Sequence, residues 1–315
     1  MAQNVPKLVF SKVTRKDRPI CEVRGGASEG TIVYINEGHC CNDCSDKCYK
    51  KKTKCCDDCL SGISGGGCTQ CGGKMKKEMF EGMEIHDMLR AIDNFRQRET
   101  TQVLREFRIH DNGTMVPIPK RTPEHGFIFG ATGSGKSVFC TMYAMMYQKL
   151  NSKKQSNVVY LITNIAEDPE IDKIPNLIRI PIDDIMNDLV APGPIHDCMI
   201  IFDDVDAIPE KDKFTKVERL RDQMLTTGRH FGISCLVTSH LGANFQRTKV
   251  PINESGFVVV FPRGGNWNQI HRILNTYGGL DRQQEDTIRK LPSRWVLVNK
   301  TYPPFVVYEK GCYLL

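Results

Sequence analysis

The feature that most constrains the fold is the stretch 130–137, which reads Gly-Ala-Thr-Gly-Ser-Gly-Lys-Ser. It follows an apolar run at 126–129 and precedes a segment of helical periodicity at 138–150. The order of strand, glycine loop and helix, with the spacing G-x-x-x-x-G-K-[ST], defines a phosphate-binding loop. The flanking strand and helix argue against a glycine-rich turn that matches by chance.

The residue types of this loop suit a nucleoside triphosphate with its metal ion. The glycines let the backbone turn tightly and aim N–H groups at phosphate oxygens, and the following helix adds its dipole. Lys136 supplies a positive charge, and the Ser137 hydroxyl is a ligand for Mg²⁺. ATP and Mg²⁺ are therefore the expected cofactors. The expected contacts are Gly130, Ala131, Thr132, Gly133, Ser134, Gly135, Lys136, Ser137 and Val138.

Bulk composition places the chain among globular proteins. It has 315 residues, of which 40% are hydrophobic and 25% charged, enough for a large buried core. The sequence contains no run of about 18 apolar residues, which is the length that would predict a membrane span. The first seven residues lack the apolar core of a signal peptide, so we expect an intracellular protein that is not secreted.

Positive charge gathers at the beginning of the chain. The formal net charge is +6, and residues 1–78 alone contribute +5. Such an excess favours an anionic partner, nucleic acid first. A solvated basic surface is the plainer alternative.

Cysteines gather in the same region. Nine of the 14 lie between positions 40 and 71 and include three C-x-x-C pairs. Two such pairs can complete a tetrahedral Zn²⁺ site, whereas a redox disulfide cluster is the competing interpretation. Lysines between the pairs suit contact with a phosphate backbone, and docking to a protein is a second use. The expected zinc ligands are Cys41, Cys44, Cys56, Cys59, Cys68 and Cys71, with Cys40, Cys48 or Cys55 also possible.

The chain divides by pattern into four parts. Residues 1–38 predict a small β element, and 39–78 form the cysteine-rich zinc-binding module. Residues 79–120 predict a linker helix at 79–98 and a hairpin of strands 102–109 and 115–118. The ATPase domain is expected at 121–315.

Strands and helices alternate after the glycine loop. Apolar, β-branched runs predict strands at 158–163, 177–181, 198–204, 232–240, 256–261, 294–300 and 304–309. Helices are predicted at 183–190, 210–227, 268–277 and 282–291. This alternation indicates an α/β fold, a P-loop NTPase whose mostly parallel sheet is covered by helices.

Ligands of such sheets bind where the parallel strands end. Asp203 ends an apolar strand 67 residues after Lys136 and suits a Walker B aspartate that holds Mg²⁺. Asp204 is placed to orient the attacking water. Ser239, or its neighbour His240, ends another strand and could sense the γ-phosphate, although a polar strand end facing water is the alternative.

An arginine is expected to stabilise the transferring phosphoryl group from a neighbouring subunit. Arg229, in the stretch Thr-Gly-Arg-His-Phe-Gly directly before a predicted strand, is the first candidate. Arg247 and Arg263 are rivals for the same role.

These motifs together resemble the FtsK–HerA superfamily of DNA-pumping ATPases, and within it the poxvirus-type genome-packaging ATPases of large eukaryotic DNA viruses. The resemblance rests on the glycine loop, Ile-Ile-Phe-Asp-Asp, Gly-Arg-His-Phe-Gly-Ile-Ser and Thr-Ser-His, in this order. It covers roughly residues 120–310. The family often has glutamine where this chain has Ser239-His240, and the cysteine-rich insert is not a general family feature.

The resemblance implies a ring-forming motor, a homo-oligomer expected to be a hexamer, which drives double-stranded DNA into a preformed capsid. A capsid or portal-vertex protein is then a possible partner, and the host cytoplasm (viral factory) or the virion the expected location. The competing functions are a helicase or recombination ATPase, and a zinc-dependent nucleic-acid-binding scaffold that only senses nucleotide.

Overall fold

The computed structural model describes residues 6–12, 15, 17–36, 106–152, 157–242, 247–264 and 266–315. The chain forms two compact units, one of 1–21, 30–107 and 314 and the other of 22–29, 108–313 and 315. The predicted zinc-binding cysteines between 40 and 71 and the predicted linker helix at 79–98 lie outside the described residues. No helix in the described ranges is both long and apolar enough to cross a bilayer.

The smaller unit contains the strands expected at the beginning of the chain. β1 (Lys7–Ser11) pairs antiparallel with β3 (Ile32–Asn36), and β2 (Arg18–Arg24) lies on the other side of β3. Leu8 stands opposite Ile35, and both are buried. These β-branched and apolar side chains give the short strands a common buried face.

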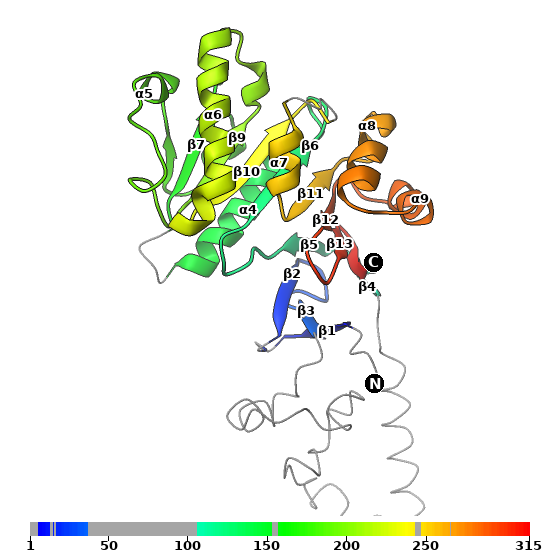
Figure 1. Ribbon diagram of the computed structural model, residues 1–315. Helices are drawn as coiled ribbons and strands as arrows, with labels where there is room; N and C mark the ends of the chain where they lie inside the picture. The colour runs from blue at the N-terminus through cyan, green and yellow to red at the C-terminus, as the bar shows by residue number, and fades with distance from the viewer. Residues whose placement is uncertain are drawn as a thin grey trace, which may run out of the picture. The chain divides into compact units, whose positions relative to one another are not determined.

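The larger unit is built on a sheet in the order β14-β13-β12-β11-β6-β10-β9-β7-β8. The six strands from β11 to β8 run parallel, whereas β12 pairs antiparallel with both β11 and β13. Figure 1 shows these strands side by side, with β6 and β10 near the middle. The strands are β6 (His125–Phe129), β7 (Val159–Thr163), β8 (Leu177–Arg179), β9 (Met199–Asp203), β10 (Ser234–Ser239), β11 (Phe257–Val260), β12 (Val296–Asn299), β13 (Phe305–Tyr308) and β14 (Gly311–Leu314).

Helices follow the strands, including one at Lys249–Glu254 that the sequence did not predict. In the described ranges the α-helices are α4 (Lys136–Asn151), α5 (Ile182–Met186), α6 (Lys211–Thr227), α7 (Lys249–Glu254), α8 (Trp267–Arg272) and α9 (Arg282–Lys290). Short 3₁₀ turns are η2 (Ile171–Lys173), η3 (Val205–Ala207) and η4 (Gly228–Phe231), and η5 (Ile273–Tyr277) is a π-helix that continues α8.

Alternate side chains of the central strands are buried on opposite faces of the sheet. Phe127 and Phe202 belong to a core cluster with Met224 of α6, whereas Ile128 and Ile201 are equally buried and lie outside that cluster. Because neighbouring strand residues point to opposite faces, both faces must be covered. The α/β fold with a mostly parallel, covered sheet is therefore confirmed.

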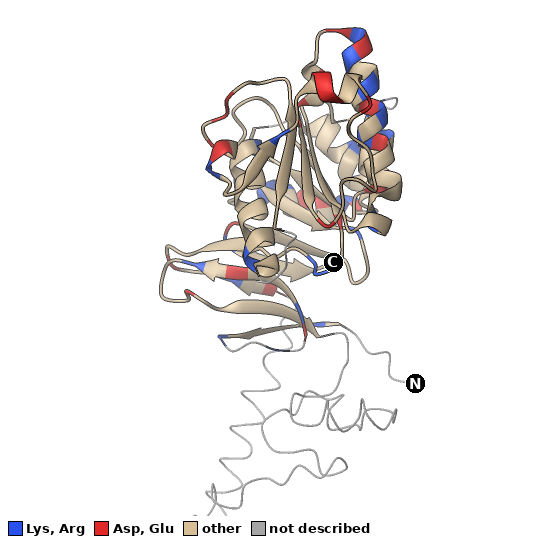
Figure 2. Ribbon diagram, turned by 90° about the vertical axis from the view of Figure 1, so that its left-hand side faces the viewer, with Lys and Arg blue, Asp and Glu red and all other residues tan. Residues whose placement is uncertain are grey.

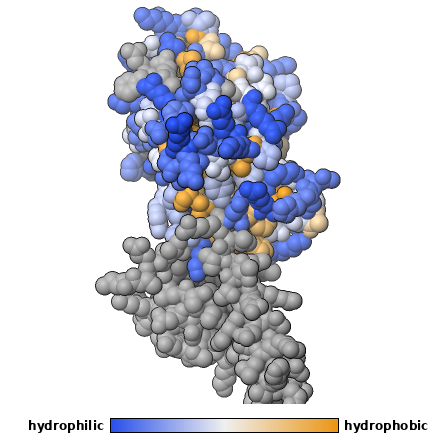
Figure 3. All heavy atoms as spheres, turned by 90° about the vertical axis from the view of Figure 1, so that its right-hand side faces the viewer, coloured by the Kyte–Doolittle hydropathy of each residue, from blue (hydrophilic) through white to orange (hydrophobic). Residues whose placement is uncertain are grey.

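Polar side chains dominate the outer faces of the helices. Acidic and basic residues alternate along α6, the tallest helix in Figure 2. The face that carries α8 and α9 is largely hydrophilic, with apolar atoms only in small groups (Figure 3). α6 thus turns a charged side to water and an apolar side, with Val217, Leu220 and Met224, to the core.

One local prediction is wrong. The residues 111–113 do not form a hairpin, because β4 (Glu106–Arg108) and β5 (Thr114–Pro117) belong to different sheets. The Asp111 carboxylate accepts hydrogen bonds from Gly113 N at 2.6 Å and from Ser28 N at 3.1 Å. A side chain that binds two backbone segments explains the turn residues here better than a two-residue hairpin does.

Candidate nucleotide-binding site

The glycine loop connects β6 to α4 in the conformation that a phosphate cradle needs. Gly133 has φ +74° and Gly135 φ +109°, a region that side-chain-bearing residues rarely adopt. At Gly130 the reason is space, since a Cβ there would lie 2.4 Å from Ser134 Oγ and 2.7 Å from Phe261 Cδ2. The glycines are therefore required by backbone shape and by close packing.

The N-terminus of α4 is open to an anion. Gly135 is the N-cap, no side chain caps the helix and no acidic residue lies in its first turn. The first N–H groups of a helix need an acceptor, and the helix dipole favours a negative one. Ala131, Thr132 and Gly133 are exposed beside this end. These features fit a phosphate group.

Lys136 is buried and its ammonium group is already surrounded by acceptors. Its Nζ donates to Gly130 O at 3.0 Å, lies 3.1 Å from His240 Nδ1 and forms an ion pair with Asp204 at 3.5 Å. A lysine can only donate, so His240 Nδ1 must accept. The motif lysine, one strand-end histidine and one strand-end carboxylate therefore meet in front of the loop.

His240 bridges the lysine and the carboxylate. Because Nδ1 accepts from Lys136, the ring proton of the neutral form lies on Nε2, which is 2.7 Å from Asp204 Oδ2. The histidine thus fixes the orientation of Asp204. Ser239, the other candidate sensor, is buried and donates to Asp206 Oδ2 at 2.7 Å.

Asp203 ends β9 in a buried position. Burial raises the pKa of its carboxyl to about 6, and the negative charge of Asp204 adds to the effect. Thr238 opposes this rise in pKa, because its hydroxyl donates to Asp203 Oδ1 at 2.9 Å. A buried carboxylate with a raised pKa gains most from a nearby cation.

Asp204 adopts a left-handed conformation with φ 44°. Its backbone N donates to Thr238 Oγ1 at 2.8 Å, and the same hydroxyl lies 3.0 Å from Asp204 Oδ1. Strained residues of this kind cluster at functional sites when their surroundings hold them. Thr238 therefore organises both carboxylates, a role that the strand-end rule could have suggested but that the sequence motifs did not identify.

Asp168 is a second residue that the sequence motifs did not identify. It follows β7, and Ser137 Oγ donates to its Oδ2 at 3.0 Å. Thr163 at the end of β7 stands beside Asp203 at the end of β9, so the two loops are neighbours. An aspartate shortly after a predicted strand was the available signal.

Arg294 also lies against the loop. Its Cδ would be 3.4 Å from a Cβ built on Gly135, and its side chain is exposed. Trp295, the next residue, packs edge-on against Phe139 of α4 with ring centroids 5.1 Å apart. The segment that leads into the antiparallel strand β12 thus brings a positive charge beside the phosphate-binding loop, which periodicity alone could not reveal.

Arg229 lies at the other edge of the sheet. It belongs to η4, which precedes β10, whereas the loop follows the parallel strand β6. Its guanidinium donates to Glu254 O and lies 3.7 Å from the Glu254 carboxylate. The rivals differ: Arg247 stacks on Phe214 at 4.5 Å, and Arg263 follows β11 at the edge where the loop lies.

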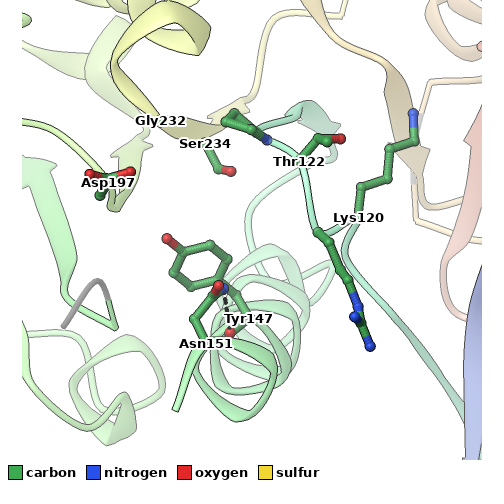
Figure 4. A pocket seen from close by; sticks show the side chains of 9 residues that line it. Lys120, Thr122, Tyr147, Asn151, Asp197, Gly232 and Ser234 are labelled. Atoms are coloured by element: carbon green, nitrogen blue, oxygen red, sulfur yellow. Dashed lines mark hydrogen bonds between the residues drawn. The ribbon is translucent and has the colours of Figure 1, made fainter. Parts of the chain in front are cut away.

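A cavity of about 100 Å³ opens at the same edge as Arg229. Figure 4 shows Tyr147 and Asn151 of α4 on one side and Ser234 at the start of β10 on another. It is smaller than pockets that hold drug-sized ligands. The open edge with the loop is therefore a better candidate for a nucleotide site than this cavity.

The oxygen donors at the loop fit Mg²⁺. Ser137 and Asp203 offer a hydroxyl and a carboxylate, which are the ligand types that this ion prefers. Among the residues that the structure describes, no group of three or more His, Cys, Asp or Glu side chains is arranged to hold a metal ion. One or two protein ligands with phosphates and water are the usual arrangement for Mg²⁺.

Comparison with known proteins finds a relative in a virophage. The chain is 38% identical over 202 residues to uncharacterized protein V3 of Sputnik virophage. The matched stretch covers 63% of this chain and 80% of that protein. No protein-family model matches.

Solved structures of low sequence identity are similar to the chain. The DNA-packaging ATPase B204 of Sulfolobus turreted icosahedral virus is 14% identical, with a TM-score of 0.41, over 57% of this chain and 94% of its own. The pCW3 conjugation coupling protein TcpA is 10% identical, with a TM-score of 0.42, over 94% of this chain and 77% of its own. The chain is thus similar to a viral DNA-packaging ATPase and to a conjugation coupling protein.

Proposed function

The chain belongs to the same family as protein V3 of Sputnik virophage, and we propose that it is an ATP-hydrolysing motor that translocates double-stranded DNA. The observation that carries this proposal is the meeting of Lys136, His240 and Asp204 in front of the glycine loop. A protein that only binds nucleotide needs the loop and its lysine. Hydrolysis also needs a positioned carboxylate, and Asp204, which His240 connects to Lys136, supplies one.

The residues divide the chemistry among them. The loop N–H groups and Lys136 bind the phosphates, and Ser137 with Asp203 would hold Mg²⁺, which neutralises phosphate charge. Asp204, oriented by His240 and Thr238, polarises the attacking water. Lys136 must exchange its present acceptors for phosphate oxygens when nucleotide binds, which frees His240 Nδ1.

The partners follow from the motif resemblance and the charge pattern. We assign the motor to a homo-oligomeric ring, a hexamer, that packages a viral genome into a capsid. The basic, cysteine-rich segment would hold zinc and grip DNA or a capsid protein. Residues 39–78 lie outside the described ranges, so the zinc and DNA contacts are proposed from the sequence alone.

The test measures the ATPase rate with and without double-stranded DNA, together with molecular mass in solution. We expect a ring whose hydrolysis rises with DNA. Lys136→Ala should abolish hydrolysis, because the phosphates lose their buried cation. Asp204→Asn should bind ATP with little change and turn over about 100-fold more slowly or worse, the range of a lost acid–base group.

Other results would redirect the assignment. Strand separation of a fluorescent duplex would favour a helicase or recombination ATPase. ATP binding without hydrolysis would favour the nucleotide-sensing scaffold. A monomer whose hydrolysis ignores DNA would eliminate the motor.

A further inference from the structure

We propose that Asp168 is a positioning residue that turns the Ser137 hydroxyl toward the metal ion. The inference rests on the proposed nucleotide function and adds a residue to it. Ser137 Oγ donates its proton to Asp168 Oδ2 at 3.0 Å. A hydroxyl has one proton and two lone pairs, and a cation can bind only a lone pair. Giving the proton to Asp168 leaves the lone pairs for Mg²⁺.

Asp168 is itself held in place by its own loop. Its Oδ1 accepts hydrogen bonds from Glu170 N at 2.8 Å and Ile171 N at 3.0 Å. Its backbone N donates to Asp172 Oδ2 at 2.9 Å. One carboxylate oxygen thus anchors the side chain, and the other is left for Ser137. A side chain locked in this way can fix the direction of its partner.

Asp203 does not fulfil this role in the structure. Its Oδ1 accepts from Thr238 at 2.9 Å, and the Ser137 hydroxyl donates to Asp168 instead. The two carboxylates therefore have separate tasks. Asp203 ends β9 and would face the metal, whereas Asp168 orients the serine from the loop after the neighbouring strand β7.

The isosteric variant Asp168→Asn separates orientation from local structure. The amide oxygen of the variant can still accept from Glu170 N and Ile171 N, so the loop keeps its anchor. The amide NH₂ donates, however, and takes the place of the carboxylate oxygen that faced Ser137 Oγ. The serine must then accept that hydrogen bond with one lone pair, so its proton competes with the remaining lone pair for the direction of the metal.

The experiment measures ATPγS affinity in Mg²⁺ and in EDTA for the full chain. Wild type should bind ATPγS more tightly with Mg²⁺ than in EDTA. In D168N the ratio of the two affinities should be about tenfold smaller, the size expected for a lost partner of a metal ligand. Affinity in EDTA and the melting temperature should stay at the wild-type values. Glu170→Gln is the matched control, because it removes one charge from the same loop and its carboxylate pairs with the exposed Lys173.

A double-mutant cycle shows whether Asp168 acts through Ser137. In a Ser137→Ala background, D168N should change the Mg²⁺ dependence less than twofold, because residues that act through one another do not have additive effects. Equal Mg²⁺ gains in D168N and wild type would overturn the inference, as would full additivity with S137A. A wild-type chain without Mg²⁺-dependent nucleotide binding would instead contradict the proposed function itself.

Discussion

At the scale of single residues, the most informative group is the carboxyl of Asp203. Its pKa of about 6 lies above the ordinary value of 3.8, chiefly because the group is buried. The folded chain therefore binds this proton more tightly than the unfolded chain does. Stability from this group is present below a pH of about 4 and is lost as pH rises through about 6. Two pKa units correspond to about 3 kcal/mol.

Asp203→Asn should stabilise the metal-free chain at neutral pH. The amide keeps an acceptor for the Thr238 hydroxyl and carries no buried charge. We expect the free energy of unfolding to rise by about 1–3 kcal/mol at a pH of about 7.5 and to change little at a pH of about 4. Urea titrations of both proteins in EDTA measure the difference at each pH.

A second group that titrates in this pH range, His125, does not alter the comparison. Burial lowers the pKa of His125 to about 4, so its contribution to stability is present at neutral pH, above its ordinary pKa, and is lost as the pH falls toward 4. It affects both proteins equally. Asp212→Asn, on the exposed first turn of α6, is the control. An equal gain for D203N at acid and neutral pH would mean that packing, not charge, is the cause.

At the scale of elements, periodicity and flanking glycines predicted every strand from β6 to β13 within a few residues. The reason is that buried parallel strands are short apolar runs between polar turns. α7 was missed because Pro251 lies in its first turn, where proline is tolerated although it usually marks a helix end. The hairpin at 111–113 failed because a side chain, not the local backbone, decides that turn.

The site was predictable only in part for a related reason. The glycine loop and Asp203 have motif spacing, so the sequence identifies them. Thr238, Asp168 and Arg294 are brought to the loop by strand order and by an antiparallel strand. Sequence distance carries no information about such neighbours until the order of strands is known.

A hydrogen bond connects the loop after β10 to helix α8. Gly242, two residues after His240, donates its backbone N–H to Gln269 Oε1 of α8 at 3.2 Å. A Cβ at Gly242 would lie 2.7 Å from the Phe129 ring, so this loop is closely packed. α8 continues directly into the π-helix η5. The loop after β10 and helix α8 therefore share a partly buried hydrogen bond.

Gln269→Ala should destabilise the chain by about 1 kcal/mol, the usual net contribution of an intramolecular hydrogen bond. Gln269→Glu keeps an acceptor oxygen and should lose less. Chemical denaturation measures both, with Gln283→Ala on the exposed side of α9 as the control. Equal losses for the alanine and glutamate variants would show that packing rather than the hydrogen bond holds the loop to α8.

At the scale of the whole molecule, Arg229, the first candidate for the catalytic arginine, lies away from the glycine loop of its own chain. Arg229 precedes β10, and the glycine loop follows β6, which runs parallel to β10. The length of such strands separates the two edges by about 17–20 Å, beyond the reach of an arginine side chain. As a catalytic arginine, Arg229 could therefore reach only the nucleotide of another copy. Its half-exposed position leaves it accessible to a neighbour.

Co-expression of two inactive variants tests this arrangement. Arg229→Ala keeps a working glycine loop, and Lys136→Ala keeps a working arginine. In mixed rings, a Lys136→Ala subunit can supply its arginine to the loop of an Arg229→Ala neighbour, and about a quarter of the interfaces should be active if mixing is random.

The matched control pairs Lys136→Ala with Asp204→Asn, because both residues belong to one chain's loop edge, where their side chains form an ion pair at 3.5 Å. No interface in those mixed rings has both residues, so their activity should stay at background. If ATPase activity recovers in the mixture of Lys136→Ala with Arg229→Ala and not in the control mixture, the site must be shared between copies. Background activity in both mixtures, with mixed rings confirmed by mass, would exclude Arg229 and direct attention to Arg263, which lies at the loop's own edge of the sheet.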